Sequence, residues 1–195
     1  YYAEKFNIPL EKLVSVSIMP CTAKKFEVGR EDQSANGYPD VDYALTTREL
    51  GKMITEAGID FANLPDEEFD NPLGEYTGAG VIFGATGGVM EAALRTVADI
   101  LENEDLPDFE YTQVRGVEAD VQEATVHLAG KDITVAVAHS TAADRKLLDS
   151  IKDGTNNDYA FIEVMGCSGG CVCGGGQPII DAQTLMSIDI RAERA

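Results

Sequence analysis

Short runs of alternating or continuous hydrophobic residues predict the strands of this chain. Residues 13–18 alternate apolar and polar side chains, as a half-buried strand does, and lead to Pro20 and Cys21. The apolar run Val81–Phe83 predicts a short strand that enters the glycine-rich segment 84–88. Further strands are predicted at 111–114, 119–128, 132–138 and 159–164. The second and third of these flank Ala129-Gly130-Lys131, which predicts a β-hairpin.

Helical periodicity and stop signals predict the helices between these strands. A capping box, Thr46-x-x-Glu49, begins a helix with apolar positions at Leu50, Met53, Ile54 and Ala57, and Gly58 ends it. A second helix is predicted from Val89 to Leu101, with one apolar face made by Val89, Ala93, Leu94, Val97 and Ile100. A third covers 141–151, and a long final helix is predicted over 181–194. Residues 60–80 are rich in Pro, Gly, Asn and acidic residues and predict a loop.

Strands and helices alternate along the chain, with one hairpin among them. This order is typical of an α/β fold in which helices flank a mixed β-sheet. No internal repeat is present. We therefore expect residues 1–195 to form one piece of a single α/β domain. Neither end carries a helix cap or a helix breaker, which favours a fragment of a longer protein.

The net charge and the distribution of hydrophobic residues argue against several classes of function. The 195 residues include 15 basic and 34 acidic side chains, and the formal net charge is −19. Such a surface argues against binding to nucleic acid or to anionic membranes, which need a basic face. No apolar stretch approaches the roughly 20 residues that span a bilayer, and no signal peptide is visible, so we expect a cytoplasmic protein without membrane insertion.

The four cysteines occur as one single residue and one cluster. Cys21 follows Met19 and Pro20, whereas Cys167, Cys171 and Cys173 lie in the glycine-rich segment 166–176. Thiolates on such a backbone suit an iron–sulfur cluster, because glycine lets the main chain pass close to a bulky inorganic group. Zinc bound by the four thiolates is the main alternative, although zinc does not require the glycine run. Structural disulfides are a further alternative, typical of small secreted proteins.

Several residues near the cysteines are candidates for the same site. If the chain is helical after Cys21, Lys24 lies one turn on and can pair with Glu27 at i, i+3; a solvated surface pair is the alternative. Met19 and Met165 each precede a cysteine by two residues, which favours a shared pocket over two separate core positions. The segment 84–88 lacks the spacing of a phosphate-binding loop and instead suits close approach of backbone to a cluster. His127 and His139 are interpreted as structural residues, with no partner evident from the sequence.

Three segments resemble those of a known family, the iron-only (FeFe) hydrogenases. Residues 19–27, Met-Pro-Cys-Thr-Ala-Lys-Lys-Phe-Glu, are similar to the second signature motif of that family. Residues 163–178, which contain Cys167-x-x-x-Cys171 and the run Gly174-Gly175-Gly176, are similar to the third. Residues 83–95 resemble the segment between the two. The similarity extends over nearly the whole chain.

The resemblance implies a cofactor and a role for each matched residue. The cofactor of the family, the H-cluster, joins a 4Fe–4S cubane to a di-iron unit that carries CO, cyanide and a bridging dithiolate. By resemblance, Cys21 and Cys167 ligate the cubane, and Cys171 bridges the cubane and the di-iron unit. Lys24 donates a hydrogen bond to a cyanide and is supported by Glu27. The residues expected to line the pocket of the di-iron unit are Met19, Met165, Phe83 and Val89.

The implied reaction is the reversible reduction of protons to hydrogen. The implied partners are ferredoxin-like domains and a first-motif lobe of the same chain, with ferredoxin or NAD(P)H-oxidising subunits as electron partners. The first motif of the family is not found in residues 1–20, so we expect the fragment alone to be inactive, to lack the cofactor, and to be able to form a non-native homodimer. Cys173 departs from the family pattern and is a possible substitute ligand. A sensory or iron–sulfur assembly relative, or a zinc-bound structural module, is the alternative function.

Overall fold

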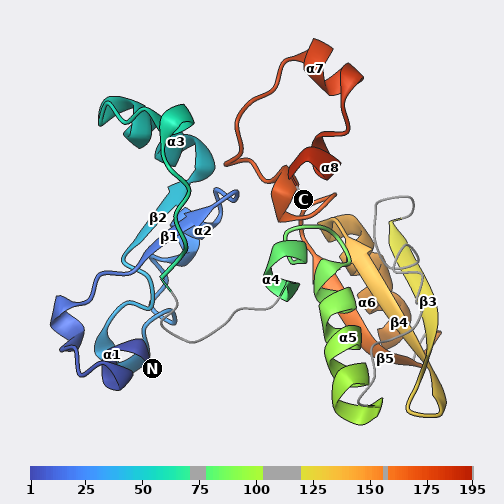
Figure 1. Ribbon diagram of the computed structural model, residues 1–195. Coiled ribbons are helices and arrows are strands. Elements are labelled where there is room, and N and C mark those ends of the chain that lie inside the picture. Colours follow the sequence, from blue (N-terminus) through green and yellow to red (C-terminus); the bar gives the residue numbers. More distant parts are fainter. Residues whose placement is uncertain (71–77, 103–119, 156–157, 195) are drawn as a thin grey trace. The chain divides into compact units, whose positions relative to one another are not determined.

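The computed structural model describes residues 1–70, 78–102, 120–155 and 158–194. The chain divides into two compact units. The first unit comprises Tyr1–Tyr76 and Gly174–Asp181, and the second comprises Thr77–Cys173 and Ala182–Ala195. In Figure 1 the first unit carries the labels α1, β1, α2, β2 and α3, and the second carries α4 to α8 and β3 to β5.

The first unit is built on a small parallel sheet. Its helices and strands are α1 (Tyr2–Lys5), β1 (Val16–Met19), α2 (Lys24–Glu27), β2 (Tyr43–Thr46) and α3 (Thr47–Glu56). Single 3-10 turns occur at 10–12, 35–37 and 61–63. β1 pairs with β2 in the register Val16↔Tyr43 to Met19↔Thr46, and α2 lies in the connection between the strands. The strand predicted at 13–18 is thus present from Val16, but its apolar side is not buried, because Val16 and Ile18 are 52% and 48% exposed.

The capping box predicted for α3 is confirmed. The Thr46 hydroxyl accepts a hydrogen bond from the Glu49 amide (3.2 Å), and the Thr46 amide donates one to the Glu49 carboxylate (2.8 Å). The helix ends at Ala57, and Gly58 follows with a φ of +68°, a conformation that glycine adopts without strain. Local chemistry therefore determines both ends of α3.

The second unit contains a three-stranded mixed sheet between two helices. Its elements are α4 (Ala79–Ile82), α5 (Gly88–Glu102), β3 (Val121–Leu128), β4 (Lys131–His139), α6 (Thr141–Lys152), β5 (Tyr159–Met165), a 3-10 turn at Cys171–Cys173, α7 (Ala182–Ser187) and α8 (Ile190–Arg194). The strand order is β3-β4-β5, with β3 antiparallel and β5 parallel to β4. The predicted α/β class with a mixed sheet is confirmed.

Both faces of β4 are buried, each against a different helix. Val135 and Val137 pack with Met90 and Leu94 of α5. The alternate residues Ala136 and Ala138 pack with Leu147 of α6. Since successive side chains of a strand point to opposite faces, β4 is the centre of this unit's core. Figure 1 shows α5 and α6 beside these strands.

Several predicted elements of the second unit are confirmed. The hairpin of β3 and β4 turns at Ala129 and Gly130, whose φ angles of +50° and +74° are those of a two-residue turn that suits strand twist. The helix predicted at 141–151 is α6, and the strand predicted at 159–164 is β5. The strand predicted at 111–114 lies outside the described residues.

Three predictions for the second unit are wrong. Residues 79–82 form the helical turn α4 rather than a strand, because three apolar residues are too few to decide between the two. The predicted apolar face of α5 is only partly its buried face, since Leu94 is buried as predicted, but Val89, Val97 and Ile100 are exposed and Met90 and Ala98 are buried instead. The long final helix is divided into α7 and α8. Ser187 and Asp189 lie at the break, and both residue types compete for backbone hydrogen bonds within helices.

In the part of the chain that is described, no helix is long and apolar enough to cross a membrane.

Candidate metal centre

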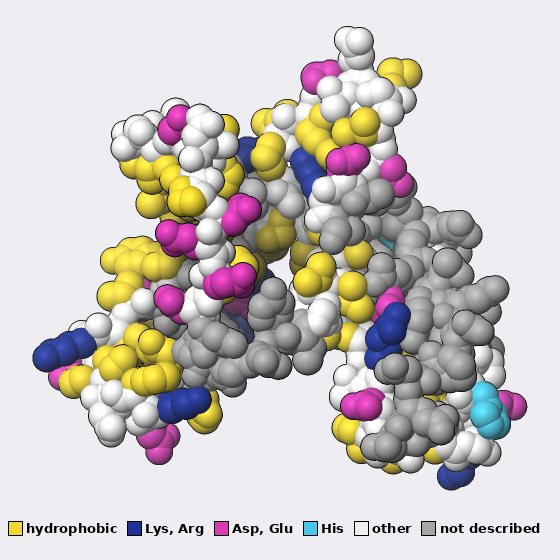
Figure 2. Space-filling view, viewed as in Figure 1, with side chains coloured by type: hydrophobic (Ala, Val, Ile, Leu, Met, Phe, Trp, Pro, Cys, Tyr) yellow, Lys and Arg dark blue, Asp and Glu magenta, His cyan; other side chains and the backbone are white. Residues whose placement is uncertain are grey.

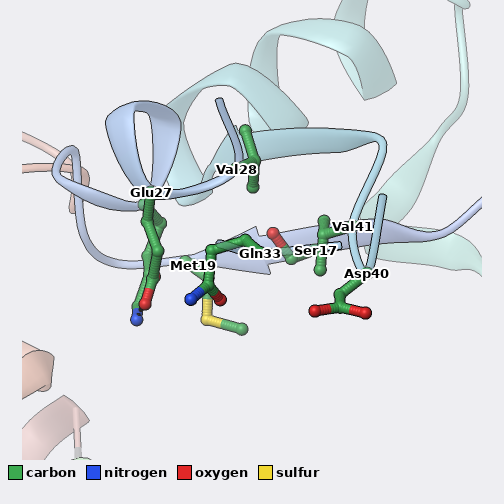
Figure 3. Close-up of a pocket in the computed structure, with 8 residues that line it drawn as sticks. Ser17, Met19, Glu27, Val28, Gln33, Asp40 and Val41 are labelled. Atoms are coloured by element: carbon green, nitrogen blue, oxygen red, sulfur yellow. Dashed lines mark ion pairs between the residues drawn. The ribbon is translucent and has the colours of Figure 1, made fainter. Parts of the chain in front are cut away.

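Residues of the first cysteine motif line a pocket in the first unit. The pocket has a volume of about 220 Å³. Its lining residues come from β1, from α2 and from the loop that leads to β2: Ser17, Met19, Lys24, Glu27, Val28, Gln33, Asp40 and Val41. Figure 3 shows Met19 and Gln33 close together in this lining, with Glu27 on one side and Ser17, Val41 and Asp40 on the other. The structure therefore places Met19, Lys24 and Glu27 in the lining of one pocket.

The Lys24–Glu27 pair closes one side of this pocket. The Lys24 ammonium and the Glu27 carboxylate form an i, i+3 ion pair on α2, and both side chains are partly exposed. The neighbouring Lys25 turns elsewhere, because its ammonium lies 2.7 Å from the Glu49 carboxylate and donates to the Ala44 carbonyl at 3.1 Å. Two adjacent lysines thus have different partners, and only Lys24 lines the pocket.

The glycine run of the second cysteine motif lies against the first motif. The Gly176 amide donates to the Pro20 carbonyl (2.8 Å), and the Gly176 carbonyl accepts from the Arg48 amide (3.1 Å). A Cβ atom at Gly176 would lie 2.9 Å from the Pro20 carbonyl carbon, so only glycine fits. Residues more than 150 positions apart are therefore neighbours in the first unit. The glycine run serves backbone packing beside Cys21, a function that the sequence analysis did not identify.

The second cysteine cluster forms a loop at the end of β5. Cys167 and Cys171 are exposed, and Gly169 and Gly170 between them have φ angles of +86° and +88°. The Gly170 amide donates to the Cys167 carbonyl (3.1 Å), and the Val172 amide donates to the Gly84 carbonyl (3.0 Å). A Cβ atom at Gly170 would lie 2.4 Å from the Gly84 carbonyl oxygen. Glycine thus lets this loop pack directly on the segment 84–88.

Two polar residues hold the cysteine loop to the sheet and were missed as site residues. His139, at the end of β4, is buried, and its Nδ1 lies 3.2 Å from the Ser168 hydroxyl, directly after Cys167. The next residue, Ser140, has a φ of +80° and donates from its amide to the Met165 carbonyl (2.9 Å). From the sequence, His139 is expected to be structural with no evident partner, and its contact with Ser168 corrects the second point. No local signal identifies this contact, because the pairing of β4 with β5 creates it.

Each predicted site residue has a defined place in one of the two units. Cys21 is partly buried in the first unit with Met19, Lys24 and Glu27. The other predicted residues lie in the second unit: Phe83, Val89, Met165, Cys167, Cys171 and Cys173. Phe83 and Val89 flank the segment 84–88, at 45% and 36% exposure. All four cysteines are thiols.

Exposed thiols on a glycine-rich loop suit an iron–sulfur cluster. Among the described residues, no group of three His, Cys, Asp or Glu side chains that could hold a metal ion is found. A cluster instead accepts thiolates at separate iron atoms and hydrogen bonds at its sulfurs. The Thr86 hydroxyl is buried without a hydrogen-bond partner, and a Cβ at Gly170 would lie 2.7 Å from the Thr86 amide nitrogen. The backbone of Thr86 therefore lies beside the cysteine loop.

Known proteins match this chain over most of its length. The family model "Iron only hydrogenase large subunit, C-terminal domain" matches residues 1–175. An NADP-reducing hydrogenase subunit of Solidesulfovibrio fructosivorans is 50% identical over 91% of the chain and 30% of its own length. Iron hydrogenase 1 of Clostridium pasteurianum is 47% identical over 100% of the chain and 34% of its own length. A probable cytosolic Fe-S cluster assembly factor of Drosophila willistoni is 30% identical over 91% of the chain.

Solved structures agree with these sequence matches. An [FeFe]-hydrogenase from Chlamydomonas reinhardtii is similar at a TM-score of 0.74 and 36% identity, over 100% of this chain and 55% of that one. The chain thus spans about a third of these curated hydrogenases and about half of the solved chain. Because the family model covers most of the residues and the structural similarity covers all of them, the chain belongs to the iron-only hydrogenase large-subunit family.

Proposed function

We propose that this chain is part of an iron-only hydrogenase that catalyses the reversible reduction of protons to hydrogen. The observation that carries the proposal is the pocket beside Cys21, where Met19, Lys24 and Glu27 meet. These three residues are those that the resemblance assigns to the di-iron unit, and an assembly factor that binds only a cubane would not need them. The identity to named hydrogenases, 47–50%, also exceeds the 30% identity to the assembly factor.

The cofactor in this proposal is the H-cluster, which supplies the metal centre where protons and electrons combine. Cys21, Cys167 and Cys171 hold it through their thiolates, and Cys173 is a possible substitute ligand. The Lys24 ammonium donates a hydrogen bond to an anionic ligand of the cluster, and Glu27 keeps the ammonium in place. Met19, Met165, Phe83 and Val89 provide apolar, polarisable surroundings that limit access of water.

Electron partners and location belong to the same proposal. We propose ferredoxin-like domains of the same protein, and ferredoxin or an NAD(P)H-oxidising subunit, as electron partners. The name of the Solidesulfovibrio relative, an NADP-reducing hydrogenase subunit, supports an NAD(P)H-oxidising subunit as the electron partner. A cytoplasmic location stays a prediction, since the relatives include a periplasmic hydrogenase large subunit of Nitratidesulfovibrio vulgaris.

The first experiment measures iron and acid-labile sulfide in the complete protein after anaerobic reconstitution. We expect Cys167→Ala to contain about four fewer of each than the unmutated protein, because it loses a thiolate ligand of the cluster. The matched control is Cys173→Ala, which keeps the metal if Cys173 is not a ligand. Binding of zinc in place of iron, with no sulfide, would contradict the proposal and favour a structural zinc module.

The second experiment tests hydrogen turnover in the complete protein. We expect Lys24→Ala to lower hydrogen evolution at least about tenfold, because a charge-assisted hydrogen bond to the cofactor is lost. Lys52→Ala is the control, since Lys52 forms a similar surface pair with Glu56 in the same unit. Equal activity of the two variants would remove Lys24 from the proposed site. Full iron content without hydrogen turnover in the unmutated protein would instead favour a sensory or assembly relative.

A further inference from the structure

Glu163 is a buried carboxylate on β5 of the second unit. It lies on β5 opposite Val137 of β4, and its residue exposure is 5%. A carboxylate in such surroundings is costly unless each oxygen has a hydrogen-bond donor. Position 163 would be more simply filled by an apolar residue if packing alone mattered. The buried carboxylate of Glu163 therefore indicates a role other than apolar packing.

Both oxygens of this carboxylate accept hydrogen bonds from the start of α5. The Gly87 amide donates to Oε1 at 2.8 Å, and the Met90 amide donates to Oε2 at 2.7 Å. Helix amides at an N-terminus lack partners within the helix and favour a negative charge. The acceptor here lies more than 70 residues away on a strand. The Glu163 carboxylate therefore links β5 to α5, in addition to capping the start of that helix.

The segment that Glu163 holds is in direct contact with the cysteine loop. Gly84 lies three residues before Gly87, and its carbonyl accepts from the Val172 amide, between Cys171 and Cys173. A Cβ at Gly88 would lie 1.7 Å from the Ile82 carbonyl oxygen, so the turn between them has no free space. A turn packed this tightly transmits displacement rather than absorbing it. The position of this turn depends on the Glu163 carboxylate at one end and on the Val172 amide at the other.

We propose that Glu163 is a positioning residue for the cysteine loop. Its carboxylate fixes the turn 84–90 against β5, and the turn fixes the backbone between Cys171 and Cys173. The same contacts set the positions of Phe83, directly before this turn, and of Val89, within it. The part of this proposal that concerns a metal centre rests on the proposed function, whereas the hydrogen-bonded link itself does not.

Amide hydrogen exchange in the metal-free chain tests the link. Glu163→Gln keeps the shape of the side chain but has one acceptor for two donors. We expect exchange at Gly87, Met90 and Val172 to become about tenfold faster or more, with Val135 and Val137 in the core within about twofold. The control is Asp99→Asn, which removes one exposed carboxylate from the same helix and leaves all five amides unchanged.

A second variant breaks the other end of the link and keeps Glu163. A Cβ added by Gly84→Ala would lie 3.0 Å from the Val172 side chain. We expect faster exchange at Val172 alone. Unchanged exchange at Val172 in Glu163→Gln would overturn the proposal. Equal acceleration at Val135 and Val137 would also overturn it, since Glu163 would then serve global stability only.

Retention of iron tests the consequence for the metal centre. In the complete protein after anaerobic reconstitution, we expect Glu163→Gln to lose iron to a chelator several-fold faster than the unmutated protein and Asp99→Asn. Equal rates of iron loss would overturn the positioning of a metal centre even if the exchange results hold. If the unmutated complete protein takes up no iron, the proposed function fails, while amide exchange still decides whether Glu163 holds the loop.

Discussion

The two units of this chain are stabilised internally by different kinds of contact. The second unit has a core with two apolar clusters, one on each face of its sheet. In the first unit, Ala3 is the only buried hydrophobic residue among those described. Large apolar side chains of that unit are exposed instead, including Val16, Phe26, Tyr43 and Phe61. Figure 2 shows hydrophobic side chains gathered on the surface of this part.

This difference shows what each unit contributes to the candidate site. The second unit presents Cys167 and Cys171 on a loop that a packed sheet supports. The first unit positions Lys24 and Glu27 by hydrogen bonds, a helix cap and ion pairs, which are individually weak. We therefore expect core mutations to affect mainly the second unit and changes in local polar contacts to affect mainly the first.

The largest expected effect comes from a matched pair of methionine substitutions. Met90, in the second unit, is fully buried, whereas Met53, in the first, is half exposed. Met90→Ala should lower the free energy of unfolding by about 2–5 kcal/mol, because it leaves a cavity. Met53→Ala should change it by less than about 0.5 kcal/mol. Urea unfolding measures both. Equal losses would show that the first unit has a core of its own.

Removal of the helix cap should affect only the first unit. Thr46→Ala eliminates the capping box and should cost about 1 kcal/mol, seen as lost amide protection in α3. Thr55→Ala is the control, because the Thr55 hydroxyl only donates to the Gly51 carbonyl of the same helix. Loss of protection in β3 and β4 after Thr46→Ala would contradict the independence of the two units.

The hydrogen bond between Ser168 and His139 is a polar contact that supports the cysteine loop of the second unit. Ser168→Ala removes a hydrogen bond that holds the cysteine loop to β4 and should cost about 1 kcal/mol. The ¹⁵N shifts of the His139 ring should change as well. Ser187→Ala is the control, since the Ser187 hydroxyl donates only within α7. Unchanged ring shifts in Ser168→Ala would remove this contact from the support of the loop.

The smallest expected effect concerns the pKa of one carboxyl group in the first unit, that of Glu49. The hydrogen bond from Lys25, followed by that from the Thr46 amide, lowers the pKa of Glu49 from 4.5 to about 2. Because the folded pKa lies below the ordinary value, the contribution of Glu49 is present above pH 4.5 and is lost as the pH falls towards 2.

NMR titration of the Glu49 carboxyl carbon tests this shift. Lys25→Ala should raise the midpoint towards 4.5, and Lys52→Ala should leave it unchanged. A midpoint near 4.5 in the unmutated chain would show that the contact of Lys25 with Glu49 does not persist in solution.

Elements that depend on local chemistry were predictable from the sequence. The capping box of α3, the hairpin turn at Ala129-Gly130 and the end of α6 before Gly154 each follow from a few adjacent residues. The motifs around Cys21 and Cys167 indicated the family in the same way. The pairing of Lys24 with Glu27 was also predictable, because the two residues lie three positions apart on α2.

Other features depend on contacts between distant segments. Periodicity placed Leu94 correctly on the buried face of α5 but also placed Val97 and Ile100 there, whereas the helix turns Met90 to the sheet, with Glu163 bound at its start. The contacts of Gly176 with Pro20 and of His139 with Ser168 likewise join residues far apart in sequence. Sequence determined which residues carry thiols, caps and turns, because those properties are local. Only the tertiary structure decided which of them meet, because burial and hydrogen bonding depend on the partner that folding brings near.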